Sequence, residues 1–139
     1  MIRDVKPQDA TVITKIYNEY ITNSIISFET EPLTEEDMLS RIVQISSKYP
    51  YLVYETGGIV VGYCYAHAWK ERAAYRYTAE TTVYLSPAYT GRGIGTLLMQ
   101  KLIEECRNKN YRALIACITD DNIASKSLHI RLGFKQVSH

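Results

Sequence analysis

The chain has 139 residues, 46% of them hydrophobic and 22% charged, which is enough to bury one core but short for two domains. We therefore expect a single domain over residues 1–139. The net charge of +1 excludes the basic surface typical of nucleic-acid binding and the acidic tail of a chaperone-like protein. No apolar run has membrane-spanning length, and Met1–Val5 lacks the apolar core of a signal peptide.

Hydrophobic periodicity and turn residues predict the elements of the first half of the chain. In chain order these are a strand at Ile2–Val5, a helix at Pro7–Ile21, a helix from Thr34 to about Ser47, and a hairpin of strands Tyr51–Glu55 and Ile59–Trp69. Thr34 precedes three acids, which is typical of a helix start because the hydroxyl caps first-turn amides and the acids lie at the positive end of the dipole. Gly57 and Gly58 predict the tight turn of the hairpin.

In the second half, strands and helices alternate. The pattern predicts a strand at Tyr77–Leu85, a helix at Gly95–Asn108, a strand at Ala113–Ile118, a helix at Ile123–Leu132 and a last strand from Phe134 onward. A meander of strands followed by alternation indicates an α/β or α+β fold with a largely antiparallel sheet. Cys64, Cys106 and Cys117 form no CxxC pair, so we expect free thiols in a cytoplasmic protein and neither a redox nor a zinc role.

The segment TGRGIGT, residues Thr90–Thr96, joins an apolar strand to a helix and contains three glycines. Glycines let the backbone close around a phosphate, and a helix N-terminus supplies free amides and the positive end of a dipole. A P-loop is excluded because its Gly-Lys pair would fall on Thr96 and Leu97, and the dinucleotide fingerprint is excluded because threonine stands at its third glycine. An anion-binding turn remains, beside the alternative of a purely structural turn.

The segments VYLSPAYTGRGIGTLLMQKLIEECR and ALIACITDDNIASKSLHIRLGF resemble the GNAT superfamily of acyl-CoA-dependent N-acetyltransferases. Position 90 departs from that pattern, because threonine stands where Gln or Arg is usual. The blocks IYNEYITNSIISFETEPLT, GYCYAHAWKERAAYRYTAETTVYLSP and NIASKSLHIRLGF resemble the phosphinothricin and methionine sulfoximine acetyltransferase branch. The resemblance implies the GNAT fold, in which a mixed, twisted sheet opens near Val83–Leu85 to admit the pantetheine arm and has helices on both faces. It also implies acetyl-CoA as cosubstrate, no metal, and an amino group as acceptor.

The resemblance also implies which residues hold acetyl-CoA. The turn and the helix start after it would bind the pyrophosphate through backbone amides, and one strand together with an asparagine would bind the pantetheine arm. The pyrophosphate residues are Gly91, Arg92, Gly93, Ile94, Gly95 and Thr96, and the pantetheine residues are Val83, Tyr84, Leu85 and Asn122. A helix cap is the alternative role for Asn122.

Two further residues are implied to be catalytic. Glu80 would act as the general base, through a water, because an ammonium must lose a proton before its nitrogen can attack a thioester. His129 would protonate the leaving CoA thiolate or help to remove the amine proton. The alternatives are a salt-bridged strand glutamate and a histidine packed on a helix face.

For the substrate, the resemblance implies a small amino acid such as phosphinothricin, methionine sulfoximine or methionine sulfone. Its anionic groups require cations, and arginine can bind two oxygens at once. The residues expected to line this side are Phe28, Glu29, Lys70, Arg72, Ala73, Ala74 and Tyr75. The alternatives are another amine acceptor and a CoA-binding module without turnover.

The resemblance further implies a homodimer. Members of the branch continue after the match to Leu132–Phe134 with strands that finish the sheet. We therefore expect the C-terminal strands to be truncated in the chain as given, which leaves an edge of the sheet open to pairing.

Overall fold

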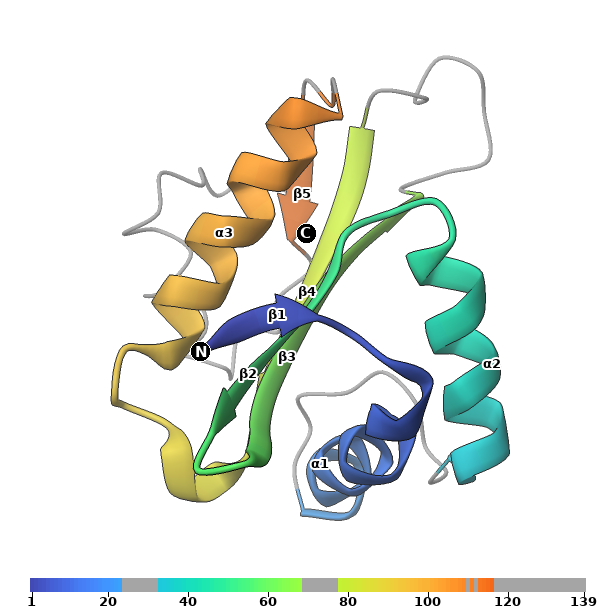
Figure 1. Ribbon diagram of the computed structural model, residues 1–139, viewed down its shortest axis with the longest axis vertical. Coiled ribbons are helices and arrows are strands. Elements are labelled where there is room, and N and C mark those ends of the chain that lie inside the picture. The colour runs from blue at the N-terminus through green and yellow to red at the C-terminus, as the bar shows by residue number, and fades with distance from the viewer. Residues whose placement is uncertain (24–32, 69–77, 110, 112, 117–139) are drawn as a thin grey trace.

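A computed structural model describes residues 1–23, 33–68, 78–109, 111 and 113–116 (Figure 1). Its strands are β1 (Ile2–Asp4), β2 (Tyr51–Thr56), β3 (Ile59–Ala68), β4 (Thr78–Leu85) and β5 (Ala113–Ala116). Its helices are α1 (Ala10–Asn23), α2 (Glu35–Ser46) and α3 (Ile94–Asn108), with short 3₁₀ turns η1 (Pro7–Asp9) and η3 (Pro87–Tyr89). Every element predicted for these ranges is present. The predicted helix at 123–132 and the strand from 134 lie outside the described residues.

The five strands form one sheet in the order β1-β2-β3-β4-β5. The first four pair antiparallel, and β5 pairs parallel to β4, so the predicted mixed and mostly antiparallel sheet is confirmed. The β2–β3 turn uses Gly57 and Gly58 at φ of +58° and +80°, a left-handed conformation that glycine adopts without a steric penalty.

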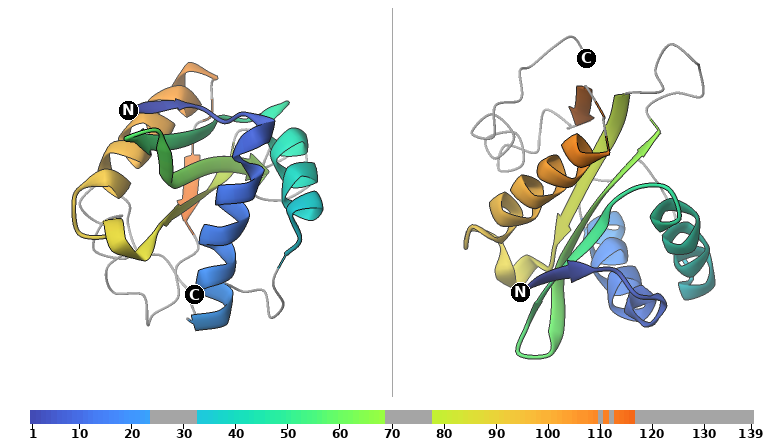
Figure 2. Two further views of the ribbon diagram at one scale, coloured as in Figure 1. Left: turned by 60° about the horizontal axis from the view of Figure 1, so that its bottom comes forward. Right: turned by 45° about the horizontal axis from the view of Figure 1, so that its top comes forward.

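Helices cover both faces of the sheet, as predicted. Figures 1 and 2 show α3 on one face and α1 with α2 on the other. Each face has its own group of buried side chains: Ile13 and Ile42 belong to the α1–α2 side, and Leu98 and Leu102 to the α3 side. None of the helices in the described ranges is both long and apolar enough to cross a membrane.

Helix starts follow the local chemistry of the sequence. The hydroxyl of Thr34 accepts a hydrogen bond from the Asp37 amide at 3.1 Å, so the predicted cap of α2 is confirmed. The predicted helix from Pro7 begins with the turn η1 before α1. α3 begins at Ile94, one residue earlier than predicted, because the carbonyl of Gly93 already accepts from the Leu97 amide.

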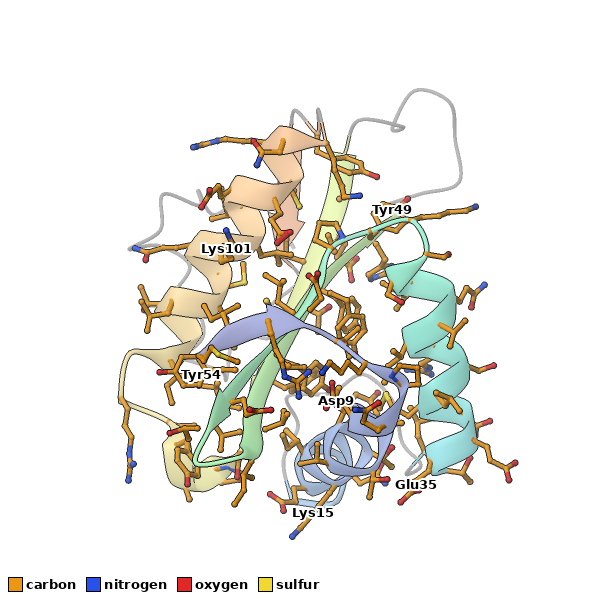
Figure 3. All side chains as sticks on the ribbon, in the orientation of Figure 1. Asp9, Lys15, Glu35, Tyr49, Tyr54 and Lys101 are labelled. Carbon is orange, nitrogen blue, oxygen red and sulfur yellow. The ribbon has the colours of Figure 1, made fainter. Side chains whose placement is uncertain are left out.

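An ion-pair network joins the N-terminal strand to its neighbours. Arg3 on β1 donates to both carboxylate oxygens of Asp9 at 2.9 Å each and to Glu55 on β2 at 2.9 Å. Figure 3 places Asp9 between the end of β1 and α1. Burial opposes ionisation of Asp9, but hydrogen bonds from Arg3 and from the Lys6 amide outweigh it and lower the pKa of the carboxyl.

Candidate active site

The turn Thr90–Gly93, called the glycine turn below, connects η3 to α3. Gly91 and Gly93 have φ of +78° and +82°, so both lie in the left-handed region that side chains rarely adopt. A Cβ built on either residue meets no other atom within 4 Å. Backbone conformation, and not crowding, therefore requires glycine at both positions.

The first turn of α3 presents backbone amides beside the glycine turn. Gly93 is the N-cap residue, and it supplies no side-chain hydrogen bond to the helix start. The first turn of α3 carries no acidic residue that would repel an anion. Such a start favours a bound anion, because free amides and the positive end of the dipole point the same way.

The side chains of Thr90 and Arg92, both in the glycine turn, contact residues of η3. The guanidinium of Arg92 lies 5.0 Å from the ring centre of Tyr89, although the residue is exposed. The Thr90 hydroxyl donates to the Pro87 carbonyl at 3.1 Å, so this side chain stabilises η3. That contact gives a structural role to the threonine at the position where the motif usually has Gln or Arg.

Strand β4 connects Glu80, near its start, to the glycine turn after its end. At about 3.3 Å per residue, the run from Glu80 to Leu85 is roughly 17 Å long. Successive side chains alternate between faces: Val83 and Leu85 pack on the α3 side, whereas Tyr84 packs on the α1–α2 side. Glu80 has the same parity as Tyr84 and therefore lies on the α1–α2 face.

The two neighbours of β4 pair with different lengths of it. The described pairing with β3 runs from Ala68↔Ala79 to Gly62↔Leu85. The described pairing with β5 covers Thr78–Thr81. The predicted opening of the sheet at Val83–Leu85 concerns partners outside the described residues and stays a prediction.

Glu80 contacts a residue that sequence reasoning missed. His67 stands directly opposite it on β3, and the imidazole Nε2 lies 3.3 Å from the carboxylate Oε1. Both side chains are partly accessible, at 37% for His67 and 24% for Glu80. The salt-bridged alternative for Glu80 and its catalytic role are thus compatible, since a paired carboxylate this accessible can still meet a substrate.

Tyrosine rings pack beside this pair on the α1–α2 face. Tyr65 stacks on Tyr51 with ring centres 4.8 Å apart and lies 5.7 Å from the His67 ring. Further along, Tyr84 contacts Tyr63 at 5.6 Å and Tyr17 at 5.5 Å. Tyr65 thus connects the imidazole of His67 to a group of packed tyrosine rings on this face of the sheet.

Several expected site residues lie outside the described residues. They are the catalytic His129, the pantetheine residue Asn122, and the substrate residues Phe28, Glu29, Lys70, Arg72, Ala73, Ala74 and Tyr75. Of the expected set, the structure brings Glu80, Val83–Leu85 and the turn residues Gly91–Thr96 onto one strand–turn–helix unit.

The described residues include no group of three or more His, Cys, Asp or Glu side chains placed to hold a metal ion. Cys64 and Cys106 are free, as expected from the sequence, and both are buried. Burial raises the pKa of both thiols, that of Cys106 to about 11. Cys117 lies outside the described residues.

Comparison with known proteins identifies the class to which this arrangement belongs. The model of the acetyltransferase (GNAT) family matches residues 13–134. The chain belongs to this family and is an N-acetyltransferase whose acetyl donor is acetyl-CoA. The resemblance seen in the sequence is confirmed.

Within the family, the chain is similar to acetyltransferases named for phosphinothricin and for methionine sulfoximine. A phosphinothricin N-acetyltransferase of Streptomyces viridochromogenes is 35% identical over 96% of this chain and 73% of its own length. An L-methionine sulfoximine/L-methionine sulfone acetyltransferase of Salmonella typhimurium is 34% identical over 96% of this chain and 78% of its own. The crystal structure of a phosphinothricin acetyltransferase from Sinorhizobium meliloti in complex with acetyl-CoA superposes with a TM-score of 0.95 at 37% identity, covering 99% of this chain and 76% of that one. The GNAT fold expected from the sequence is therefore confirmed.

Proposed function

We propose that the protein transfers the acetyl group of acetyl-CoA to the amino group of a small amino acid of the phosphinothricin or methionine sulfoximine/sulfone type. The observation that carries this proposal is the position of Glu80. It is a partly accessible carboxylate on the strand that leads into a glycine turn and an uncapped helix start. The relatives named for these two substrates support the choice of acceptor.

Acetyl-CoA would lie along β4, with its two ends recognised separately. The glycine turn and the amides of Ile94, Gly95 and Thr96 would hold the pyrophosphate. Backbone groups of Val83–Leu85 would pair with the pantetheine arm, joined by the side chain of Asn122. The thioester would then lie near Glu80, because that residue is at the end of β4 far from the glycine turn.

The reaction needs three proton movements. Glu80 takes a proton from the substrate ammonium through a water, and the freed nitrogen attacks the thioester carbonyl. The carbon–sulfur bond breaks, His129 gives a proton to the departing thiolate, and the second proton of the nitrogen replaces the one that His129 has given up. The products are the N-acetylated amino acid and CoA. On the acceptor side, Lys70 and Arg72 would bind the anionic groups.

The test is thiol release from acetyl-CoA with phosphinothricin, methionine sulfoximine, methionine sulfone and a panel of ordinary amines. We expect turnover with the first three, and a loss of kcat of about 100-fold or more in Glu80→Gln, the size of a general-base contribution. Acetyl-CoA affinity should be unchanged, because the glutamine keeps the shape and the turn is untouched. Turnover confined to other amines would move the proposal to another acceptor, and binding without turnover would indicate a module without catalysis.

We further propose a single-domain homodimer that works in the cytoplasm on this small molecule, with neither metal nor nucleic acid. Light scattering of the purified protein tests the dimer, and activity in the presence of a chelator tests independence from metal. A monomer or a chelator-sensitive activity would contradict the respective part.

A further inference from the structure

His67 is placed to act on Glu80 by the register of the sheet. The two residues are directly paired across β3 and β4, so their side chains leave the sheet on the same face. Nε2 and Oε1 are 3.3 Å apart, which is close enough for the imidazole and the carboxylate to interact directly. The contact is therefore built into strand pairing and does not depend on a long, mobile side chain.

The imidazole itself is held from the side. The ring of Tyr65, two residues earlier on β3, lies 5.7 Å from it at an interplanar angle of 46°. Tyr65 is fixed in turn, because its ring stacks on that of Tyr51 with ring centres 4.8 Å apart. A side chain locked in this way can fix the direction of a neighbouring group.

We propose that His67 is a positioning residue for the reaction: its imidazole orients the Glu80 carboxylate toward the acceptor amine. This inference rests on the proposed function, because it concerns the residue assigned there as general base. A carboxylate in a fixed direction needs no reorganisation when it receives the proton, and that gain appears in the chemical step. His67 acts through Glu80 and not on the substrate.

If the pair were purely structural, replacing His67 would lower the melting temperature and leave kcat unchanged. Both side chains are partly accessible, and exposed ion pairs contribute little to stability. Replacing His67 should therefore leave the melting temperature close to that of the wild type. A change in kcat without a change in folding or in acetyl-CoA affinity is the signature of positioning.

The test is a double-mutant cycle on the full chain with methionine sulfoximine and acetyl-CoA. The variants are His67→Leu, which has no donor, His67→Gln, which keeps an N–H near Nε2, Glu80→Gln, and the double variant His67→Leu/Glu80→Gln. Glu104→Gln is the control, because that carboxylate is 63% exposed on α3 and 3.9 Å from Lys101. Acetyl-CoA affinity and melting temperature are measured for every variant.

We expect His67→Leu to lower kcat about tenfold at unchanged KM for acetyl-CoA, and His67→Gln to recover to within about threefold of the wild type. In the Glu80→Gln background, adding His67→Leu should lower kcat by less than about twofold. Equal losses in both backgrounds, or a kcat of His67→Leu equal to the wild type, would overturn the inference. Full activity of Glu80→Gln would instead refute the assigned base, so the two failures are distinct.

A second readout needs no turnover. In the ¹⁵N spectrum of labelled protein, the His67 Nε2 resonance should move in Glu80→Gln and stay in place in Glu104→Gln. An Nε2 resonance that is indifferent to Glu80 would show that the pair does not form, and it would overturn the inference even for a variant that folds poorly.

Discussion

Two carboxylates of this protein show how partners decide what a residue does. Asp9 is 4% exposed and receives two hydrogen bonds from Arg3 and one from the Lys6 amide, so it is held in one place. Glu80 is partly accessible and pairs with an imidazole. The first arrangement suits a structural ion pair, and the second suits a group that meets a substrate.

The Asp9 network predicts a loss of stability at acid pH. The pKa of Asp9 is lowered in the fold, while an unfolded aspartate titrates near about 3.9, so its contribution is present above that pH and is lost as the pH falls through the folded pKa. Asp9→Asn should cost about 2 kcal/mol in the free energy of unfolding at pH 7, because it leaves Arg3 with a weaker partner. Urea unfolding at pH 7, 5 and 3 measures this. The wild-type and variant values should converge toward pH 3, and a difference independent of pH would contradict the account.

Residue patterns in the sequence identified Glu80 and the turn glycines but not His67. Glu80 was found because it lies in a string of residues that matches the family. His67 can be connected to Glu80 only when the register of β3 and β4 is known. The sequence does not give that register, because the segment between the two strands is too long to be a short turn of known type. No local signal in the sequence could have paired His67 with Glu80.

At the scale of elements, prediction succeeded wherever local chemistry decides. The hairpin at Gly57–Gly58, the Thr34 cap and the amphipathic helices were all predicted within a residue or a short turn. Among the details that were not predicted are the 3₁₀ start at Pro7–Asp9 and the first residue of α3. Both depend on hydrogen bonds at helix ends, where the sequence signal is weakest.

The glycine turn and the β2–β3 turn at Gly57–Gly58 provide a matched test of the anion site. Gly93→Ala and Gly58→Ala both place a Cβ on a left-handed residue, at φ of +82° and +80°, with no atom within 4 Å. Each should cost about 1 kcal/mol in the free energy of unfolding. Only Gly93→Ala should also weaken acetyl-CoA binding, by about tenfold, because its turn is the one that we propose holds the pyrophosphate. Calorimetric titration distinguishes them, and equal affinities would place the coenzyme elsewhere.

At the scale of the whole molecule, the sheet separates two groups of buried side chains. The α3 side contains Cys64 and Cys106 among aliphatic side chains and supports the strand–turn–helix unit. The α1–α2 side carries the tyrosine rings beneath Glu80 and His67. The turn proposed to bind the cofactor and the face proposed to carry catalysis are thus stabilised by separate groups of contacts.

This arrangement predicts how the thiols react. Burial raises the pKa of Cys64 and brings that of Cys106 to about 11, so both remain protonated and covered at pH 8. Peptide mapping by mass spectrometry after iodoacetamide treatment should find both unmodified in the native protein and modified in denaturant. Rapid native labelling of Cys64 would show that the α3 side opens far more readily than its packing allows.

The central claim is that acetyl passes from the thioester to an amino group of an anionic amino acid. The most direct measurement is mass spectrometry of methionine sulfoximine after incubation with acetyl-CoA and the protein, with released CoA counted in parallel. The account predicts one acetyl group on the amine for each CoA released, and about 100-fold less product or lower with Glu80→Gln over the same time. Release of CoA without acetylated product, or no release with any acceptor, would contradict it.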